Sequence, residues 1–440
     1  MNEKKPTLLI ITQVYIPDPA SVGQYLHDAA VEMVRRGYRV RVLAASRGYD
    51  DPKLRFPLSE HVDGVDVRRV SFSSFGKRSI AIRLAAQISL LFQVVIRALF
   101  VRSLDAILVS TSPPMASAAA LVIAAIRRVP IVYWVMDINP DQAVALGAVK
   151  SSSLAVKLFD TLNRAILARA HAVVTLDRFM ATSLERKCDV SQKLAVFPLW
   201  PHDDFLDVVA HEDNPFRAKH KLHGKFVVMY SGNHSPANPI STIVNAAERL
   251  QDHRDIVFAF IGGGAGKREV VDAIKRGAKN ILDLPYQPLA EIKYSLSAAD
   301  VHVVSVGASS VGVVHPSKVY GAMAVARPVL SVGPKPSHVS DLLDACDIGR
   351  HVNHGQLDKA VAAILELRDM ANASRSRLGR RGQELVQNGL SKRNLCTRFG
   401  NVLEGALVRQ PETSESGIPS YAWQDQPAVQ AYPTAEKKAA

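Results

Sequence analysis

Residues 226–261, FVVMYSGNHSPANPISTIVNAAERLQDHRDIVFAFI, decide the fold class. The stretch begins with an apolar run over residues 226–230 and passes through small residues and prolines into a helical pattern over residues 240–250. It ends in a second apolar run over residues 257–261. Short apolar runs that alternate with helices are typical of parallel strands buried on both faces. The stretch therefore predicts one strand–helix–strand unit of a doubly wound α/β sheet.

The same alternation continues in both directions along the chain. Further strands are predicted at residues 8–12, 38–44, 106–110, 131–135, 172–175, 281–284, 301–305 and 328–332, with helices between them. Pro198, Pro201 and Pro215, among several aspartates, break the pattern over residues 197–216, which is typical of a linker. We expect an N-terminal Rossmann-like domain over 1–205, a C-terminal one over 206–390, a last helix over 391–409 and a disordered tail over 410–440.

The composition excludes several classes of protein. The 440 residues are 48% apolar and 22% charged, which is typical of a folded chain with large cores. The net charge of +13 favours anionic partners, but no basic run interleaved with aromatics and no zinc pattern points to nucleic acid. Cys188, Cys346 and Cys396 lie far apart and make no metal or disulfide spacing. We expect no metal, no cofactor and a cytoplasmic location.

An amphipathic helix is predicted over residues 80–101. Its polar side chains, Arg83, Gln87, Gln93 and Arg97, fall on one side, which is not typical of a transmembrane helix. One interpretation is a helix packed on the sheet of its domain. The other is a helix in a membrane interface, where cationic side chains reach the headgroups. Together with the positive charge, the second interpretation predicts peripheral contact with an anionic membrane on its inner face.

Two loops of the first domain follow predicted strands. The loop over residues 13–23 ends in Gly23, where a glycine lets a ligand approach the helix start, although the loop lacks a dinucleotide fingerprint and could be an ordinary turn. The loop over residues 136–141 carries Asp137 and Asn139. These side chains could hold sugar hydroxyls or orient an acceptor, or they could cap the helix that follows Pro140.

Two loops of the second domain are rich in small residues. Gly232, Asn233 and His234 end the first strand, where backbone amides could meet a diphosphate; the alternative is a simple turn. Residues 262–267 hold four glycines and a lysine without the spacing of a Walker loop. We expect Gly263 to form a wall of a nucleotide pocket and not a triphosphate cradle.

A helix start near residue 316 is the most specific feature. Pro316 and Ser317 precede Lys318, which lies in the first turn and opposes the helix dipole. A cation at this unfavourable position favours an anionic ligand over a solvated lysine. Tyr320 and Gly321 follow in the same helix and are further candidates for substrate binding.

The chain resembles a family-four glycosyltransferase of the GT-B fold, in the branch that makes colanic acid and O-antigen polysaccharides. Thr111–Pro114, Tyr133–Leu146 and His315–Pro328 carry the resemblance. It implies two facing Rossmann-like domains with a cleft between them and a last helix that crosses back to the first domain. It implies retaining transfer from a nucleotide sugar, often UDP-linked, to a glycan or lipid-linked acceptor without an Asp-x-Asp metal. Gly23 would lie near the donor phosphates and Tyr286 beside the base.

The chain departs from this family at four places. Val313 and Gly321 stand where many relatives carry glutamates, and Asn233 and His234 stand near the place of an arginine and a lysine. The phosphate charge would then fall to Lys318, which together with Asp137 is the predicted catalytic pair. The departures keep two alternatives open: a nucleotide-sugar epimerase of the same fold, and a catalytically silent subunit that binds a partner.

Overall fold

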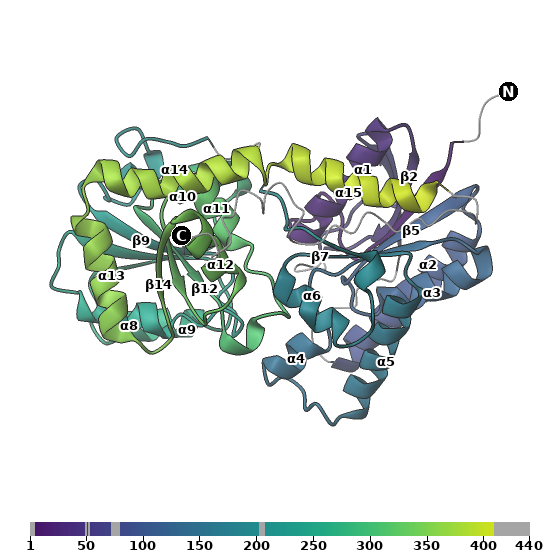
Figure 1. The fold of residues 1–440 in the computed structure, drawn as a ribbon, viewed down its shortest axis with the longest axis horizontal. Coiled ribbons are helices and arrows are strands. Elements are labelled where there is room, and N and C mark those ends of the chain that lie inside the picture. The colour runs from purple at the N-terminus through teal and green to yellow at the C-terminus, as the bar shows by residue number, and fades with distance from the viewer. Residues whose placement is uncertain (1–4, 49–50, 52, 72–79, 202–206, 409–440) are drawn as a thin grey trace, which may run out of the picture. The chain divides into compact units, whose positions relative to one another are not determined.

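The chain folds into two compact α/β units (Figure 1). In this computed structural model, residues 5–48, 51, 53–71, 80–201 and 207–408 are described. Among the described residues, the first unit runs to Leu199 and includes residues 393–408, and the second runs from Trp200 to Lys392. The tail predicted to be disordered, residues 410–440, lies outside the described residues.

The first unit is built on an eight-stranded sheet with the order β3-β4-β2-β1-β5-β6-β7-β8. All neighbouring strands are parallel except β3 and β4, which form an antiparallel pair at one edge. The strands are β1 Thr7–Ile11, β2 Arg39–Ala45, β3 Ser59–Val62, β4 Val65–Val70, β5 Leu104–Ser110, β6 Ile131–Trp134, β7 Ala172–Thr175 and β8 Leu194–Val196.

Helices cover both faces of this sheet. They are α1 Ser21–Arg35, α2 Ile80–Leu99, α3 Ala116–Arg127, α4 Asp141–Ala145, α5 Leu154–Arg169, α6 Arg178–Glu185 and α15 Lys392–Leu407. The chain leaves β1 in opposite directions toward β2 and β5, so right-handed crossovers place α1 on one face and α2, α3 and α5 on the other. Helices α2 and α5 both pack against α3.

Helix α15, the last described segment, packs beside α1 (Figure 1). The Arg36 guanidinium donates to Asn401 Oδ1 at 2.9 Å and to Glu404 Oε2 at 2.6 Å. The ring of Phe399 lies 4.2 Å from that of Trp134, centroid to centroid. The far end of the chain therefore completes the core of the first unit.

The second unit has a six-stranded parallel sheet with the order β11-β10-β9-β12-β13-β14. Its strands are β9 Phe226–Ser231, β10 Ile256–Ile261, β11 Ile281–Leu284, β12 Val301–Ser305, β13 Val329–Val332 and β14 Gly349–Val352. Its helices are α7 Pro215–Lys219, α8 Ser241–Arg249, α9 Lys267–Lys275, α10 Ile292–Ser297, α11 Lys318–Ala324, α12 His338–Cys346, α13 Leu357–Asp369 and α14 Asn372–Asn388. Short 3-10 helices occur at Ser191–Lys193, Leu289–Glu291 and Ala308–Ser310.

The prediction of two doubly wound α/β units is confirmed. Strands such as Val227–Tyr230 are buried on both faces, as their continuous apolar sequence predicts. The sequence analysis did not predict the β3–β4 hairpin or helix α14. Strand β3 is the polar stretch Ser59–Val62 at the sheet edge, and α14 buries two glycines, Gly379 and Gly382, beside Leu378, Leu385 and Val386.

Helix α2 packs in the first unit, and two of its polar side chains, Gln93 and Arg97, bond to the protein backbone. Gln93 Nε2 donates to the Ser71 carbonyl at 2.7 Å, and Arg97 Nη1 donates to the Arg69 carbonyl at 2.8 Å. Ile88 and Phe92 are exposed instead. Within the described part of the chain, no helix is both long and apolar enough to span a bilayer.

Candidate functional site

Three loops meet at the carboxyl edge of the second sheet, after strands β9, β10 and β11. The Gly232 amide donates to the Ile261 carbonyl at 2.9 Å, and the Gly262 amide donates to the Leu284 carbonyl at 3.0 Å. The His234 amide donates to the Gly263 carbonyl at 2.8 Å. These bonds extend the parallel ladder past the strand ends, at the edge where ligands of open α/β sheets bind.

Glycines allow these loops to approach one another closely. Gly262 has a φ of +125°, and a Cβ there would lie 2.1 Å from the Gly232 carbonyl oxygen. Gly264 has a φ of +123°, and a Cβ there would lie 2.4 Å from Asn233 Oδ1. A side chain at either position would push the two loops apart. Glycine is therefore needed at Gly262 and Gly264 for close packing as well as for the positive φ.

Lys318 reaches this cluster from the first turn of α11. Its side chain extends over Gly232, so that a Cβ on Gly232 would lie 2.4 Å from Lys318 Cε. Its Nζ lies 5.5 Å from the centroid of the Tyr230 ring. Among the described residues, no ion pair or hydrogen bond of this ammonium group is present. Burial lowers the pKa of Lys318 to about 8, so the group still carries most of its charge at pH 7.

His234 is buried beneath the same loops, with its ring centroid 4.7 Å from that of Tyr230. Burial, followed by the nearby Lys267 and Lys318 charges, lowers the pKa of His234 to about 4. The imidazole is therefore neutral at pH 7 and adds no positive charge to the site.

Lys267 belongs to the framework of the site. Its Nζ donates to the carbonyls of Phe260, Gly262 and Leu284 at 3.0, 2.9 and 2.7 Å, and it pairs with Asp283. These carbonyls lie in or directly after β10 and at the end of β11. With its donors used in this way, Lys267 ties the two strand ends together, in agreement with the absence of Walker spacing in the sequence.

Tyr286 forms an exposed wall beside the glycines. A Cβ on Gly263 would lie 3.2 Å from Tyr286 Cε2, and the Tyr286 hydroxyl donates to the Gly263 carbonyl at 3.4 Å. The residue is 60% exposed, and an aromatic ring at such a position suits stacking with a planar ligand.

The other predicted residues of α11 divide into two groups. Ser317 is exposed at the start of the helix and follows the half-buried Pro316, next to Lys318. Tyr320 is buried, and its hydroxyl lies 2.8 Å from His315 Nε2 and 2.7 Å from His338 Nε2. Gly321 faces the Leu296 side chain. Tyr320 and Gly321 thus take part in packing within the second unit.

In the first unit, Asp137 and Asn139 lie in the loop after β6. Thr111 Oγ1 accepts hydrogen bonds from the amides of Met136 and Asp137, both at 3.2 Å. Asn163 Nδ2 donates to the Asn139 carbonyl at 3.1 Å. The sequence analysis did not assign this positioning role to Thr111 or Asn163. No sequence signal links them, because the contacts span 24 to 26 residues.

Gly23 lies in the first turn of α1, against the loop that follows β1. Its amide donates to the Ala20 carbonyl at 3.0 Å, and a Cβ would lie 3.0 Å from Tyr15 Cα. The glycine therefore lets the helix start pack directly on the loop backbone.

The family model and the curated proteins that this chain is similar to are all described as glycosyltransferases. Residues 21–200 match the family model of the glycosyl transferase 4-like domain. A probable glycosyltransferase of Pseudomonas aeruginosa, WbjE, is 31% identical over 224 residues, which are 49% of this chain and 55% of that protein. The putative colanic acid biosynthesis glycosyl transferase WcaI of Escherichia coli is 28% identical over 200 residues, 44% of this chain and 49% of WcaI. The chain spans about half the length of these curated relatives.

Solved structures share the fold over nearly the whole chain. Sucrose-phosphate synthase from Thermosynechococcus elongatus superposes with a TM-score of 0.71 at 16% identity, covering 91% of this chain and 99% of that one. Anabaena HepE, solved with UDP and glucose, gives a TM-score of 0.66 at 15% identity, covering 91% and 100%. The predicted GT-B fold class, with two Rossmann-like α/β domains, is confirmed. The cleft between the domains stays a prediction.

Proposed function

Because residues 21–200 match the glycosyl transferase 4-like domain, we propose that the chain transfers a sugar from a nucleotide-sugar donor to a glycan or lipid-linked acceptor. The likeness to WbjE and to the colanic acid protein WcaI supports a role in cell-surface polysaccharide synthesis. The transfer retains the anomeric configuration, and the donor is UDP-linked. The UDP and glucose bound by Anabaena HepE support that choice of donor.

One observation supports the donor site above all others: the Lys318 ammonium lies over Gly232 without a charge partner among the described residues. A donor diphosphate against Gly232 and Ser317 would supply that partner. As the bond between sugar and phosphate breaks, negative charge grows on the leaving diphosphate. A preorganised cation in a partly desolvated place stabilises that charge. Tyr286 would stack on the nucleotide base.

Asp137 and Asn139 are proposed to act on the acceptor or on the hydroxyls of the transferred sugar. Thr111 and Asn163 fix the loop that carries them through backbone hydrogen bonds. A carboxylate and an amide held in this way can orient hydroxyl groups by accepting and donating hydrogen bonds.

Replacing Lys318 by alanine tests the proposal most directly. We expect Lys318→Ala to lower kcat/KM for the donor by about 100-fold or more, because it removes the cation that faces the leaving group. Lys335→Ala is the matched control, since Lys335 is an exposed lysine paired with Asp344. Circular dichroism checks the fold of both variants. Wild-type kinetics in folded Lys318→Ala would exclude the lysine from catalysis.

A screen of UDP-, GDP- and ADP-sugars, read by mass spectrometry and by thermal shift, separates the two alternatives. An epimerase would change the donor in the absence of any acceptor. A silent subunit would show neither turnover nor a rise in melting temperature with any of the donors.

The same proposal includes docking of the first unit on an anionic membrane. Helices α2, α3 and α5 expose a row of large apolar side chains on one face of the sheet, which we call the apolar helical face. Its members are Ile88, Phe92, Ile96 and Phe100 from α2 and its end, Val122 and Ile126 from α3, and Leu154 and Leu158 from α5. The α2 members follow each other at intervals of four residues, so they form one continuous stripe.

Charge complementarity favours a lipid bilayer as the occupant. Arg102, Arg128 and Lys157 are exposed on or beside the same three elements, and the whole chain carries a net charge of +13. Apolar side chains flanked by cations are typical of surfaces that enter the headgroup region. We expect the chain to float with vesicles of anionic phospholipid at low salt and less so at high salt. No flotation at low salt would contradict this proposal and leave the donor site untouched.

A further inference from the structure

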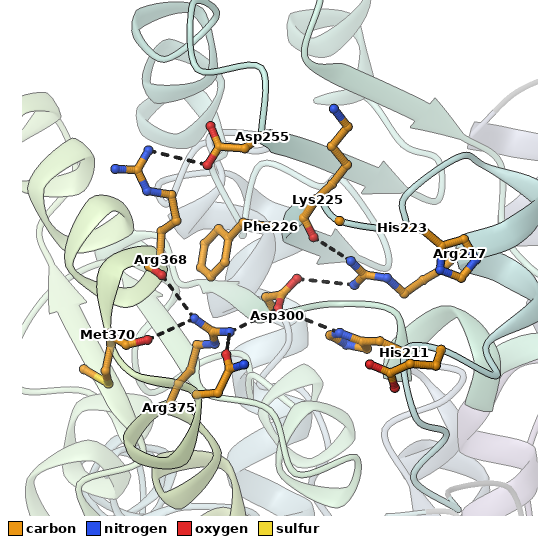
Figure 2. Close-up of a pocket in the computed structure, with 13 residues that line it drawn as sticks. His211, Arg217, His223, Lys225, Phe226, Asp255, Asp300, Arg368, Met370 and Arg375 are labelled. Carbon is orange, nitrogen blue, oxygen red and sulfur yellow. Dashed lines mark hydrogen bonds and ion pairs between the residues drawn. The ribbon is translucent and has the colours of Figure 1, made fainter.

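The opposite edge of the second sheet holds a polar pocket that the proposed transfer does not use. A cavity of about 480 Å³ lies beside the first residue of β9, Phe226, and adjoins a smaller cavity of about 300 Å³ (Figure 2). The two cavities share five lining residues, which are His211, Glu212, Asp300, Asn372 and Arg375. Asp300 immediately precedes β12, so the pocket lies at the amino ends of the strands, whereas the glycine loops lie at their carboxyl ends.

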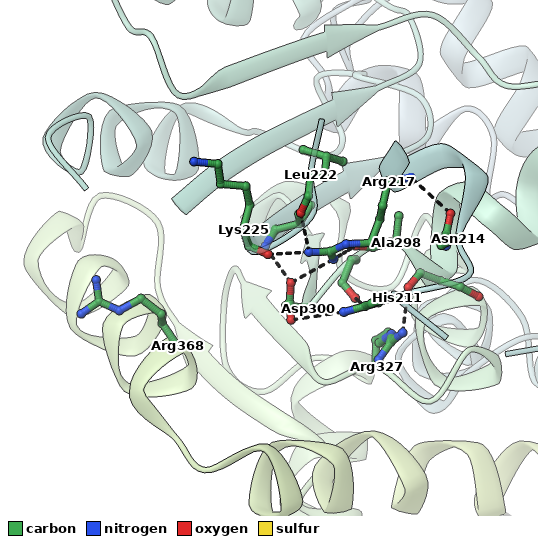
Figure 3. Close-up of polar contacts among 12 residues, drawn as sticks. His211, Asn214, Arg217, Leu222, Lys225, Ala298, Asp300, Arg327 and Arg368 are labelled. Atoms are coloured by element: carbon green, nitrogen blue, oxygen red, sulfur yellow. Dashed lines mark hydrogen bonds and ion pairs between the residues drawn. The ribbon is translucent and has the colours of Figure 1, made fainter. Parts of the chain in front are cut away.

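Two guanidinium groups pair with one buried carboxylate that lines both cavities. Asp300 lies 3.3 Å from Arg217 Nη1 and 3.7 Å from Arg375 Nη2. It also accepts from the Val227 amide at 2.9 Å. A third arginine, Arg327, lines the smaller cavity. Figure 3 labels it among the polar contacts around Asp300. Together the two linings hold five cationic side chains and three carboxylates, so they carry an excess of two positive charges. The cations are Arg217, Lys225, Arg327, Arg368 and Arg375, and the carboxylates are Glu212, Asp255 and Asp300.

Arg217 and Arg375 also serve the framework. Arg217 donates to the carbonyls of Ala298, Leu222 and Lys225 at 2.6, 2.8 and 2.5 Å. Arg375 donates to three carbonyls around the end of α13, between 3.1 and 3.3 Å. Most of their N–H donors are used, although Arg217 Nε is buried without a hydrogen-bond partner, and both charges still act on the cavity.

Arg327 is different because, among the described residues, no carboxylate contacts its guanidinium. It donates to the Ser297 carbonyl at 2.8 Å, but its Nε is buried without a hydrogen-bond partner. Within the described ranges it makes no ion pair. Burial lowers the pKa of Arg327. Arg217 and Arg375 act in the same direction, and the carboxylates of Asp300 and Glu212 act against them. A bound anion would offset the free-energy cost of holding the buried Arg327 charge near Arg217 and Arg375.

We propose that this pocket binds a small phosphorylated compound, with the phosphate between Arg327 and Arg375. A phosphate monoester carries close to two negative charges at pH 7, which matches the excess of positive charge. Guanidinium groups match the geometry of phosphate oxygens, and a donor such as Arg327 Nε gains a partner. His223 and Lys225 line the larger cavity and extend the basic surface toward its rim.

Calorimetric titration with inorganic phosphate tests the site at constant ionic strength, balanced with chloride. The Lys318→Gln chain is used throughout, so that the proposed donor site contributes little. We expect saturable binding with a Kd at or below about 1 mM, and about tenfold weaker binding after Arg327→Gln. Arg249→Gln is the control, because Arg249 is an exposed arginine on α8.

Equal binding by the parent and Arg327→Gln, or no saturation in the parent up to about 20 mM phosphate, would overturn the proposal. Should Arg327→Gln fail to fold, Lys225→Gln takes its place, since Lys225 is partly exposed and its Nζ contacts only the Arg254 carbonyl among the described residues. About threefold weaker binding is then expected, and unchanged binding would overturn the site. Donor turnover plays no part in this readout, so the outcome is independent of the proposed transfer.

Discussion

The two units share one architecture but expose different surfaces. The apolar helical face of the first unit presents eight large exposed hydrophobic side chains on three adjacent helices. The second unit has only scattered ones in its described part, such as Val208, Ile274 and Leu289. Its two sheet edges instead gather glycines, lysine and arginine. In a doubly wound sheet, the residues on the outer helical faces and the residues at the strand ends can therefore differ between domains without a change of fold.

The largest effect is expected from placing charge on the apolar helical face. Phe92→Glu combined with Ile96→Glu should weaken binding to anionic vesicles by at least about 100-fold, because each apolar side chain contributes about 1.5–3 kcal/mol when buried. Both residues are exposed, so the fold should persist. Ile274→Glu on the second unit is the matched control, and co-sedimentation is the measurement. Equal losses in both variants would remove the distinction between the units.

Gly232→Ala sharpens the comparison at the strand ends. Gly232 has a φ of +131°, and the new Cβ would displace the Lys318 side chain. We expect about 30-fold lower donor affinity together with a stability loss of about 1–3 kcal/mol from backbone strain. Gly277→Ala is the control, because Gly277 has a φ of +107° with open space around it. It should show the strain without the loss of affinity; a similar loss in both would mean that the position of Lys318 is unimportant.

The pH dependence gives a smaller but specific effect. Because the pKa of free Lys318 is lowered to about 8, the ammonium loses its proton as the pH rises through that value. A bound diphosphate raises this pKa, so binding above pH 8 takes up a proton. Donor affinity should then fall by up to about tenfold per pH unit. Titration calorimetry between pH 7 and pH 9.5 checks this, and Lys318→Gln should flatten the profile. An unchanged affinity across this range would show that the ammonium does not contact the donor.

The same lysine affects folding with the opposite sign. Its folded pKa lies below the ordinary value of 10.5, so the unfolded chain binds the proton more tightly. Between about pH 8 and pH 10.5, the contribution of Lys318 to the free energy of unfolding rises with pH. Rising pH therefore strengthens the fold at this residue while it weakens donor binding.

The fold could be predicted from the sequence because buried parallel strands read as continuous apolar runs. Strand β3, with Ser59 and Glu60 at a sheet edge, gave no such signal. Helix α14 was missed because its packing uses glycines: a Cβ on Gly379 would lie 1.9 Å from the Ala326 carbonyl oxygen. Periodicity of apolar residues cannot reveal a helix that packs through its backbone.

The candidate site was predicted in part. Gly232, Asn233, His234, Gly263, Tyr286 and Lys318 were each selected from the sequence, and the structure brings them together. The contact of Lys318 with Gly232 spans 86 residues, so only the fold reveals it. The inward bonds of Gln93 and Arg97 were equally hidden, because a helical pattern shows which side is polar but not which side faces the protein.

Helix α15 has a consequence for how the chain is made. In the first unit, the rings of Trp134 and Phe197 pack against Phe399, a residue near the end of the described chain. The second unit is contiguous from Trp200 to Lys392 in this part of the chain. During synthesis on the ribosome, part of the core of the first unit therefore stays exposed until Phe399 has been made. All described residues of the second unit are made before Phe399, so the second unit can fold completely before the first.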